Sequence, residues 1–245
     1  MNLRPATVII LVLILWTGVG ASPGLGEASE DLVQKGRNAL QAGRPHEAVE
    51  IFSRLIATDP QADFYYCRGL AYSSEEKEAL AVRDFSKAIA LKPDQPGFFL
   101  ARGFSLLRSA RHGTAIEDFS KAIELDPQNG EATGYRCRAF LATGRYRKAI
   151  EDVNSAIDLS PDESELYRLK GDVLSGLGLF RKAVYAYDTA IKLKPGNAVA
   201  YNNRGVALAV LGRAKEAIKD LRQAMELAVS TPSAVRLPGM SGNAW

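Results

Sequence analysis

Prolines recur along this chain at an almost constant interval, and this period constrains the fold more than any other feature. They stand at Pro60, Pro93, Pro127, Pro161 and Pro195, so that successive spacings are 33, 34, 34 and 34 residues. A period of this length is typical of a stacked array in which one supersecondary unit is repeated. The 245 residues are therefore expected to form an elongated array.

Three other positions keep the same period. A small residue recurs at Gly36, Gly69, Gly103, Cys137, Gly171 and Gly205. A turn position follows at Gly43, Glu76, Ala110, Gly144, Gly178 and Gly212, and then an alanine at Ala48, Ala81, Ala115, Ala149, Ala183 and Ala217. Apolar residues spaced by three and four surround them, which indicates two amphipathic helices in each repeat. The small residues let the two helix backbones cross closely, the turn glycines end the first helix, and the prolines end the second.

These residues resemble the tetratricopeptide repeat (TPR) family over residues 29–228. The resemblance implies an all-α fold, a right-handed α-solenoid of six helix-turn-helix repeats. The expected repeats are about 29–61, 62–95, 96–129, 130–163, 164–197 and 198–228. Members of the family mostly bind peptides or other proteins in a concave groove lined by the first helices. We therefore expect a non-enzymatic protein-protein interaction scaffold.

Repeat two departs from the pattern. The link between Pro60 and Gly69 is one residue shorter than its counterparts, and Glu76 replaces the turn glycine. We expect either a changed superhelical angle or a longer first helix at this point. The alternative is a solvated turn that tolerates the substitution.

The first 21 residues have the layout of an export signal. Arg4 precedes an uninterrupted apolar run from Val8 to Trp16, and small residues lead to Ala21. Residues 1–21 are expected to be a signal peptide and residues 22–28 a linker, so the protein is expected to be periplasmic or secreted. The alternative is an uncleaved apolar helix that would make the chain a membrane-anchored assembly factor, and a membrane is expected as a partner only in that case.

The TPR resemblance also places residues in the groove. The candidate partner-binding residues are Arg37, Tyr66, Leu70, Leu100, Phe104, Leu107, Arg108, Arg138, Arg168 and Asp172. Aromatic and arginine side chains are enriched at binding hot spots, and arginine can hold a carboxylate through two hydrogen bonds. The expected partner is a protein or peptide with apolar and acidic side chains. The alternative is that the leucines form inter-repeat core and the arginines a solvated face.

Signals for other chemistry are weak. No catalytic residue, metal site or cofactor is expected, because no ligand spacing or nucleophile motif occurs. The formal charge of +3 is too small to indicate a nucleic-acid partner. Cys67 and Cys137 lie two repeats apart and are expected to be buried free thiols. The acidic residues of the second helices (Glu50, Asp84, Asp118, Asp152, Asp188 and Asp220) are expected on a solvated outer face.

The C-terminal end lacks a polar cap. Residues 229–245 are rich in Pro, Gly and Ser and are expected to be a flexible tail. The apolar side of the last helix, with Ile218, Leu221 and Met225, should then be partly bare. Either the tail or a second copy of the chain would cover it, which makes self-association an alternative.

Overall fold

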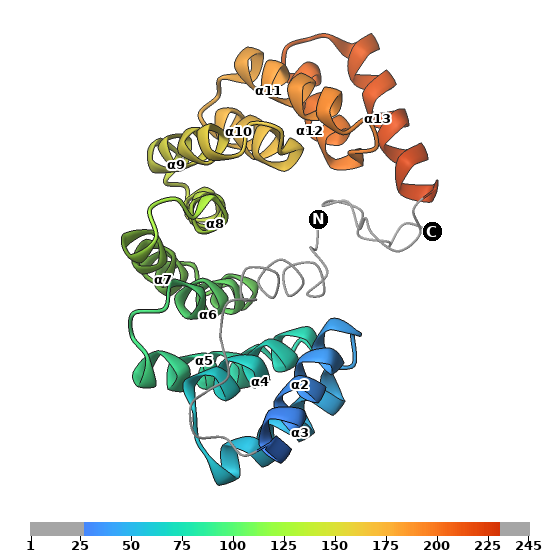
Figure 1. Ribbon diagram of the computed structural model, residues 1–245. Helices are drawn as coiled ribbons and strands as arrows, with labels where there is room; N and C mark the ends of the chain where they lie inside the picture. The colour runs from blue at the N-terminus through green and yellow to red at the C-terminus, as the bar shows by residue number, and fades with distance from the viewer. Residues whose placement is uncertain (1–26, 231–245) are drawn as a thin grey trace. The chain divides into compact units, whose positions relative to one another are not determined.

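The computed structural model describes residues 27–230, and in this range the chain contains twelve helices and no strand (Figure 1). The predicted signal segment, residues 1–21, lies outside the described residues, as does the chain after Ser230. The expected all-α architecture of helix-turn-helix repeats is confirmed for the described range. No helix between Glu27 and Ser230 combines the length and apolar character that a membrane crossing requires.

The twelve helices alternate as first and second members of six pairs. The first helices are α2 (Glu27–Gln41), α4 (Ala62–Ser74), α6 (Pro96–Arg108), α8 (Gly130–Ala142), α10 (Ser164–Gly176) and α12 (Ala198–Val210). The second helices are α3 (Pro45–Thr58), α5 (Glu78–Leu91), α7 (His112–Leu125), α9 (Tyr146–Leu159), α11 (Phe180–Leu193) and α13 (Ala214–Ser230). Helix α2 begins inside the predicted linker, and α13 continues two residues into the predicted tail.

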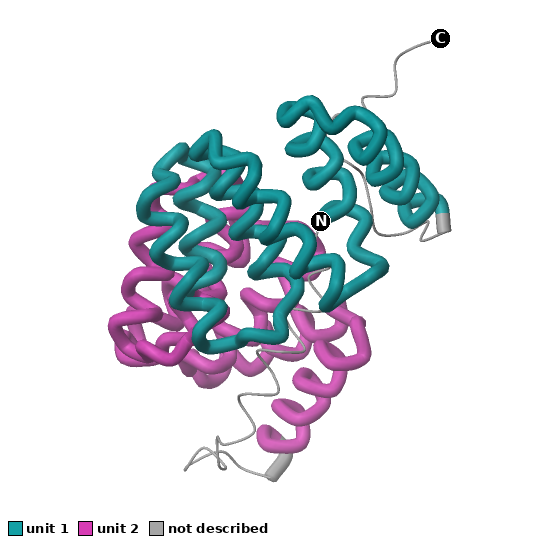
Figure 2. Tube along the Cα trace, turned by 90° about the horizontal axis from the view of Figure 1, so that it is seen from above, with its two compact units in different colours: residues 1–2, 133–245 teal, residues 3–132 magenta. Residues whose placement is uncertain are grey.

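The chain divides into two compact units (Figure 2). The N-terminal unit, in its described part, comprises residues 27–132, and the C-terminal unit comprises residues 133–230. Within each unit a first helix packs on its own second helix, and that second helix packs on the next first helix, as in α4–α5–α6 and α10–α11–α12. Neighbouring first helices also touch, α4 with α6 and α10 with α12. Each repeat therefore gains its core from its sequence neighbours.

The recurring small residue is where the two helices of a pair cross. A Cβ atom on Gly69 would lie 2.6 Å from the Phe85 ring, and one on Gly103 would lie 2.7 Å from the Phe119 ring. These distances are shorter than van der Waals contact, so a larger residue would force the helices apart. Cys137 takes the same place in α8, where its Sγ donates a hydrogen bond to the Ala149 carbonyl at 3.2 Å. The predicted role of the small residues in packing is confirmed by this geometry.

All six turns within the repeats have one conformation. The turn residue has a positive φ in every case: Gly43 (66°), Glu76 (59°), Ala110 (56°), Gly144 (71°), Gly178 (75°) and Gly212 (75°). The next residue donates its backbone N–H back across the turn, for example from Lys77 to the Tyr72 carbonyl at 2.9 Å. This bond satisfies a carbonyl at the end of the first helix.

The expectation of a longer first helix in repeat two is wrong. Helix α4 has 13 residues, as α6 does. Glu76 adopts the positive φ that glycine has elsewhere, so the tolerated turn is the alternative that agrees with the structure. The missing residue shortens the connection between α3 and α4, where the Gln61 N–H bonds to the Asp59 carbonyl at 2.9 Å.

An arginine immediately before the small residue clips the two helices of a repeat together. Arg68 donates two hydrogen bonds to the Asp84 carboxylate, from Nε at 2.7 Å and from Nη2 at 3.0 Å. The same pairing joins Arg102 to Asp118, Arg136 to Asp152, and Arg204 to Asp220. The arginine also reaches the preceding second helix, as when Arg102 Nη1 bonds to Ser86 at 3.1 Å. One side chain therefore connects three consecutive helices.

The prediction of a solvated acidic outer face is wrong for four of the six residues. Asp84, Asp118, Asp152 and Asp220 are buried, with Asp84 only 1% exposed. Each of them accepts a bidentate hydrogen bond from its arginine, which compensates the cost of burying a carboxyl group. Glu50 is exposed, as predicted.

The last helix has an uncovered apolar side, as expected from the missing cap. Ile218 is 51% exposed, Met225 53% and Val229 79%. Leu221 is half-buried, because it fills the crossing beside Gly205.

We predict that Ala110→Gly stabilises the protein by about 0.5–1 kcal/mol, because it removes the cost of a left-handed conformation at a residue with a Cβ atom. The measurement is the midpoint of urea unfolding. The matched change is Gly144→Ala, one repeat later, where a Cβ would meet nothing within 4 Å. It should destabilise the protein by a similar amount, and a destabilising Ala110→Gly would contradict the prediction.

We predict that Asp118→Ala lowers the free energy of unfolding by about 2–3 kcal/mol, because it leaves the half-buried Arg102 guanidinium without its partner. The double change Arg102→Met with Asp118→Leu should cost less, since it removes both charges. Urea unfolding measures both variants. Glu117→Ala, an exposed carboxylate next in sequence, is the control and should change little. A double variant less stable than Asp118→Ala would contradict the prediction.

Candidate functional site

The predicted groove residues are divided between the two units. Those from Arg37 to Arg108 lie in the N-terminal unit, and Arg138, Arg168 and Asp172 lie in the C-terminal unit. Each set is described within its own unit.

In the N-terminal unit the apolar candidates are mostly buried. Exposed fractions are 2% for Tyr66, 4% for Leu70, 5% for Leu100 and 8% for Phe104, and Leu107 is half-buried. The Tyr66 ring lies 4.8 Å from that of Phe98 and 5.8 Å from that of Phe85, measured between centroids. Burial of this degree agrees with the alternative that these side chains are core.

Arg108 of the N-terminal unit is engaged inside the unit. Arg108 pairs with Glu78 at 2.8 Å and donates to the Ser73 carbonyl at 3.1 Å. Its guanidinium also lies 6.0 Å from the centre of the Phe104 ring. Arg37 is half-buried on α2. Arg108 therefore ties α6 to the end of α4 and to the start of α5.

The three candidates of the C-terminal unit come together in one polar network. Glu165 accepts hydrogen bonds from Arg138 (2.6 Å) and from Arg168 (2.9 Å at Nε). Arg168 also donates to Asp172, one turn further along α10. We call the network the polar cluster; its members are Arg138, Glu165, Arg168, Asp172, Ser175, Tyr187 and Asn203.

The other members extend the polar cluster to α11 and α12. Asp172 accepts from the Tyr187 hydroxyl at 2.8 Å and from the Asn203 amide at 2.7 Å. Ser175 lies 3.3 Å from the same hydroxyl. Four helices of the unit, α8, α10, α11 and α12, thus contribute to one hydrogen-bonded group.

Burial and charge together set the ionisation of the polar cluster. Burial alone would raise the pKa of Glu165, but the hydrogen bond from Arg168 and the charges of Arg168 and Arg138 hold it below its usual range. Burial, the Asp172 charge and the bond to Asp172 raise the pKa of Tyr187. Burial would lower the pKa of Arg168, but its bond to Glu165 and the Asp172 charge raise it. These shifts hold Glu165, Tyr187 and Arg168 in their ordinary charge states near pH 7, so they are fixed hydrogen-bonding groups and not proton carriers.

An exposed apolar strip continues from the polar cluster along α12. Val206 and Val210 are 52% and 58% exposed and lie one turn apart. Val206 follows Asn203 by three positions, so the strip and the Asn203 amide share one face of the helix. Arg138, whose side chain is 23% exposed, is a partly accessible cation of the cluster.

The candidate list from the sequence lacks four members of the polar cluster: Glu165, Ser175, Tyr187 and Asn203. Tyr187 gave the clearest signal, because it is the hydroxyl-bearing exception at a position that holds phenylalanine in repeats one to three. Glu165 precedes Arg168 by three positions, a spacing that allows an ion pair on a helix. Asn203 gave no signal, since its contact with Asp172 depends on how α12 packs on α10.

The cysteines are free and buried, as predicted. Burial raises the pKa of the Cys67 thiol to about 12 and also raises that of Cys137, so neither is a nucleophile at neutral pH. No group of three metal-ligating side chains occurs between residues 27 and 230.

Family models described as tetratricopeptide repeat match residues 33–96, 106–173 and 168–228. Among solved structures, MamA is 26% identical, with a TM-score of 0.61 over 68% of this chain and 97% of that chain. YrrB, described as a TPR protein with an unusual peptide-binding site, is 21% identical, with a TM-score of 0.60 over 76% and 100%. A tetratricopeptide repeat protein from Parabacteroides merdae is 13% identical, with a TM-score of 0.72 over 84% and 88%. The last two similarities concern the fold alone.

We predict that Glu165→Gln lowers the free energy of unfolding by about 2 kcal/mol at pH 7, because two arginines then share no carboxylate. The pKa of Glu165 is depressed in the folded protein, so its contribution is complete above the unfolded value of about 4.3 and is lost as the pH falls through the folded value. The difference between wild type and variant should therefore shrink below about pH 4. Urea unfolding at several pH values measures it.

The control for this prediction is Glu151→Gln, which changes an exposed carboxylate of the same unit. It should leave stability nearly unchanged at every pH. A Glu165 variant whose deficit is constant from pH 7 to about pH 3 would contradict the assigned role.

Proposed function

We propose that this chain, which belongs to the tetratricopeptide repeat family, is a non-enzymatic scaffold that binds an extended protein segment on the first-helix face of its C-terminal unit. TPR domains bind protein or peptide partners, and the matched residues fall in all six repeats. The observation that carries the proposal is the exposed pair Val206 and Val210 beside the polar cluster.

The exposed valines supply the apolar part of the proposed site. A valine that moves from water into an interface contributes about 1.5–3 kcal/mol. Side chains more than half exposed on a helix of an ordered array have this free energy available for a partner. The partner segment is accordingly proposed to present apolar side chains to α12.

The polar cluster supplies orientation. Its hydrogen bonds hold Arg138 and Asn203 at fixed positions, so little side-chain entropy is lost when a partner binds. Arg138 donates to Glu165 yet keeps part of its side chain accessible, and it is the arginine we assign to a partner carboxylate. Arg168, which is 8% exposed, holds the cluster together and is not assigned a direct contact.

The proposed location is outside the cytosol, in the periplasm or the cell exterior. Its support is the Arg4, apolar-run and small-residue layout of residues 1–21. Mass spectrometry of the purified mature protein tests it. A chain that begins near Ser22 supports the exported form, whereas a retained N-terminus would favour the membrane-anchored assembly factor.

We predict that a photo-crosslinking residue at Val206 captures a partner protein in cells and that one at Leu91 does not. Leu91 is the matched control because it is also 52% exposed but lies at the end of a second helix. The captured protein is then purified, and its affinity is measured for wild type, Val206→Asp and Leu91→Asp. Val206→Asp should weaken binding by more than about tenfold, because a buried charge replaces an apolar contact. Equal affinities for wild type and Val206→Asp would contradict the proposal.

A further inference from the structure

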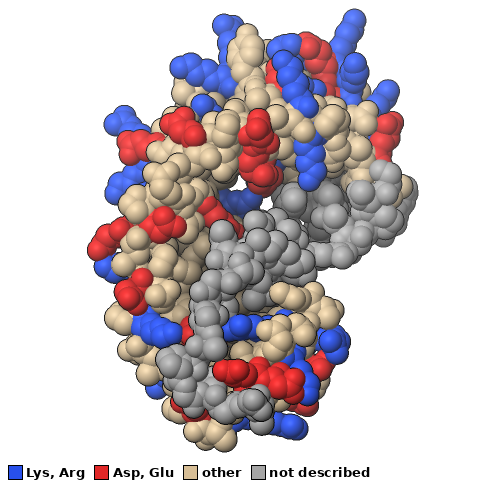
Figure 3. Space-filling view, in the orientation of Figure 1, with Lys and Arg blue, Asp and Glu red and all other residues tan. Residues whose placement is uncertain are grey.

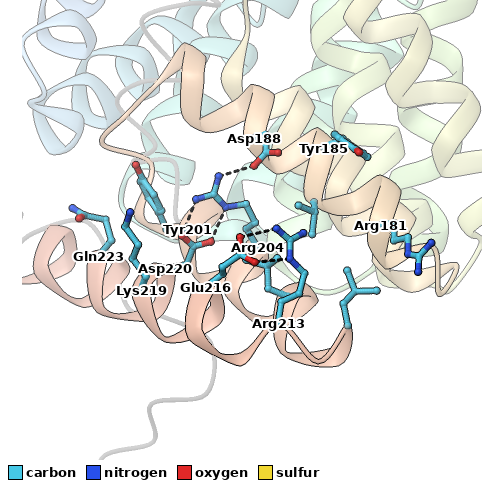
Figure 4. A pocket seen from close by; sticks show the side chains of 13 residues that line it. Arg181, Tyr185, Asp188, Tyr201, Arg204, Arg213, Glu216, Lys219, Asp220 and Gln223 are labelled. Carbon is cyan, nitrogen blue, oxygen red and sulfur yellow. Dashed lines mark hydrogen bonds and ion pairs between the residues drawn. The ribbon is translucent and has the colours of Figure 1, made fainter.

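The C-terminal unit has a cleft that the proposed function does not use. It has a volume of about 690 Å³ and is lined by side chains of α11, α12, α13 and the turn between α12 and α13, as Figure 4 shows. Most of its lining residues belong to the second helices α11 and α13, whereas the proposed partner site lies on the first helices. Val184, Leu208 and Leu211 form its apolar floor.

The carboxylates that line the cleft already form ion pairs with arginines of the lining. Arg204 donates to Asp188 at 2.6 Å and binds Asp220 at 2.6 and 2.7 Å. Arg213 holds Glu216 with two bonds, at 2.7 and 2.6 Å. All three acidic side chains of the lining therefore have cationic partners.

Two further cations of the lining remain available. Arg181, from α11, and Lys219, from α13, lie at opposite ends of the cleft (Figure 4). Neither makes an ion pair or hydrogen bond with any residue of the described range 27–230. Both are exposed, so each can meet an incoming anion without breaking an existing contact.

The whole segment that surrounds the cleft is basic. Residues 180–230 contain nine Lys or Arg and four Asp or Glu, a net charge of +5, whereas residues 27–179 contain 20 and 24, a net charge of −4. Lys and Arg side chains gather over α11 to α13 in the space-filling view (Figure 3). A local potential of this sign attracts acidic partners and accelerates their association.

The cleft also offers aromatic surface. Tyr185 is 73% exposed at its edge. The Arg204 guanidinium carbon lies over the Tyr201 ring, 5.4 Å from the ring centroid. Tyr201 is half-buried. Exposed tyrosine beside arginine is a composition enriched at protein interaction hot spots.

We propose that this cleft is a second docking site and that it binds an acidic protein segment that carries apolar or aromatic side chains. Carboxylates of the segment pair with Arg181 and Lys219, and an apolar or aromatic side chain between them packs on Tyr185 and the apolar floor. A protein segment fits better than a nucleic acid. Arg181 and Lys219 are two separate cations without a carboxylate partner in the lining, so they match two carboxylates of a peptide better than the closely spaced charges of a phosphate backbone.

The test is fluorescence anisotropy with the purified full-length chain and a short labelled peptide in which Glu and Tyr alternate. A matching peptide with Gln in place of Glu, and a labelled single-stranded oligonucleotide, are measured in parallel. The double variant Arg181→Glu with Lys219→Glu reverses the two cleft cations. Lys182→Glu with Lys194→Glu is the matched control, since it makes the same change in net charge in the same segment but outside the cleft.

The acidic peptide should bind wild type at least about tenfold more tightly than the Gln peptide, and the cleft variant should lose about tenfold in affinity. The control variant should stay within about threefold of wild type, because its two lysines do not touch the segment. Val206→Asp should bind the peptide as wild type does, which separates this site from the first-helix face. The proposal would be overturned if the acidic peptide did not bind, or if the oligonucleotide bound as tightly as the acidic peptide. It would also be overturned if the cleft variant kept its affinity or if the control variant lost as much affinity as the cleft variant.

Discussion

The close crossing of two helices at a residue without a bulky side chain is the constraint on which the remaining structure depends. At Gly69 and Gly103 the ring of a second-helix phenylalanine fills the space that a Cβ atom would need. The crossing fixes how each helix is rotated about its axis, because only one face can present the small residue. The residue one position earlier then always points to the same place on the second helix. This is why Arg68, Arg102 and Arg204 each find an aspartate 16 positions later.

Repeat five keeps the close helix crossing but lacks the Arg–Asp pair that joins the two helices in other repeats. Its charged side chains stand at different positions. Lys170 and Ala186 occupy the positions at which repeats two, three, four and six have the Arg–Asp pair. In the same repeat, the ring that fills the crossing is Tyr187, whose hydroxyl reaches Asp172 on the first helix. Two ion pairs of this repeat form within α10, between Arg168 and its neighbours Glu165 and Asp172. Asn203 and Arg138, from the adjacent first helices, bond to Asp172 and Glu165. The polar cluster therefore connects these repeats where the Arg–Asp pair is missing.

The period of the sequence predicted the helix pairs and their turns, because those depend on local residues. It did not predict the pairing of the second-helix aspartates, which were expected in solvent. That pairing spans 16 positions and depends on helix rotation, which the pattern of apolar residues does not define closely enough. For repeat two the sequence left a changed superhelical angle, a longer helix and a tolerated turn open. The tolerated turn agrees with the structure, because Glu76 accepts a conformation of modest cost when the hydrogen bonds around it are fixed by the fold. For the candidate site, residue type identified Arg138, Arg168 and Asp172, but not that Glu165 already binds both arginines.

The positions that build the fold and those that can recognise a partner are different sets. The small residue and the second-helix alanine are nearly the same in every repeat because the crossing leaves no room for alternatives. The position directly after the small residue varies from buried to exposed along the chain; it holds Arg37, Leu70, Phe104, Arg138, Asp172 and Val206 in turn. The Asp172 side chain accepts hydrogen bonds from within the unit, whereas the Val206 side chain is exposed to solvent. The proposed partner site on the first-helix face therefore requires a repeat in which this variable position is not used by a neighbour, and in the C-terminal unit Val206 of α12 meets that condition.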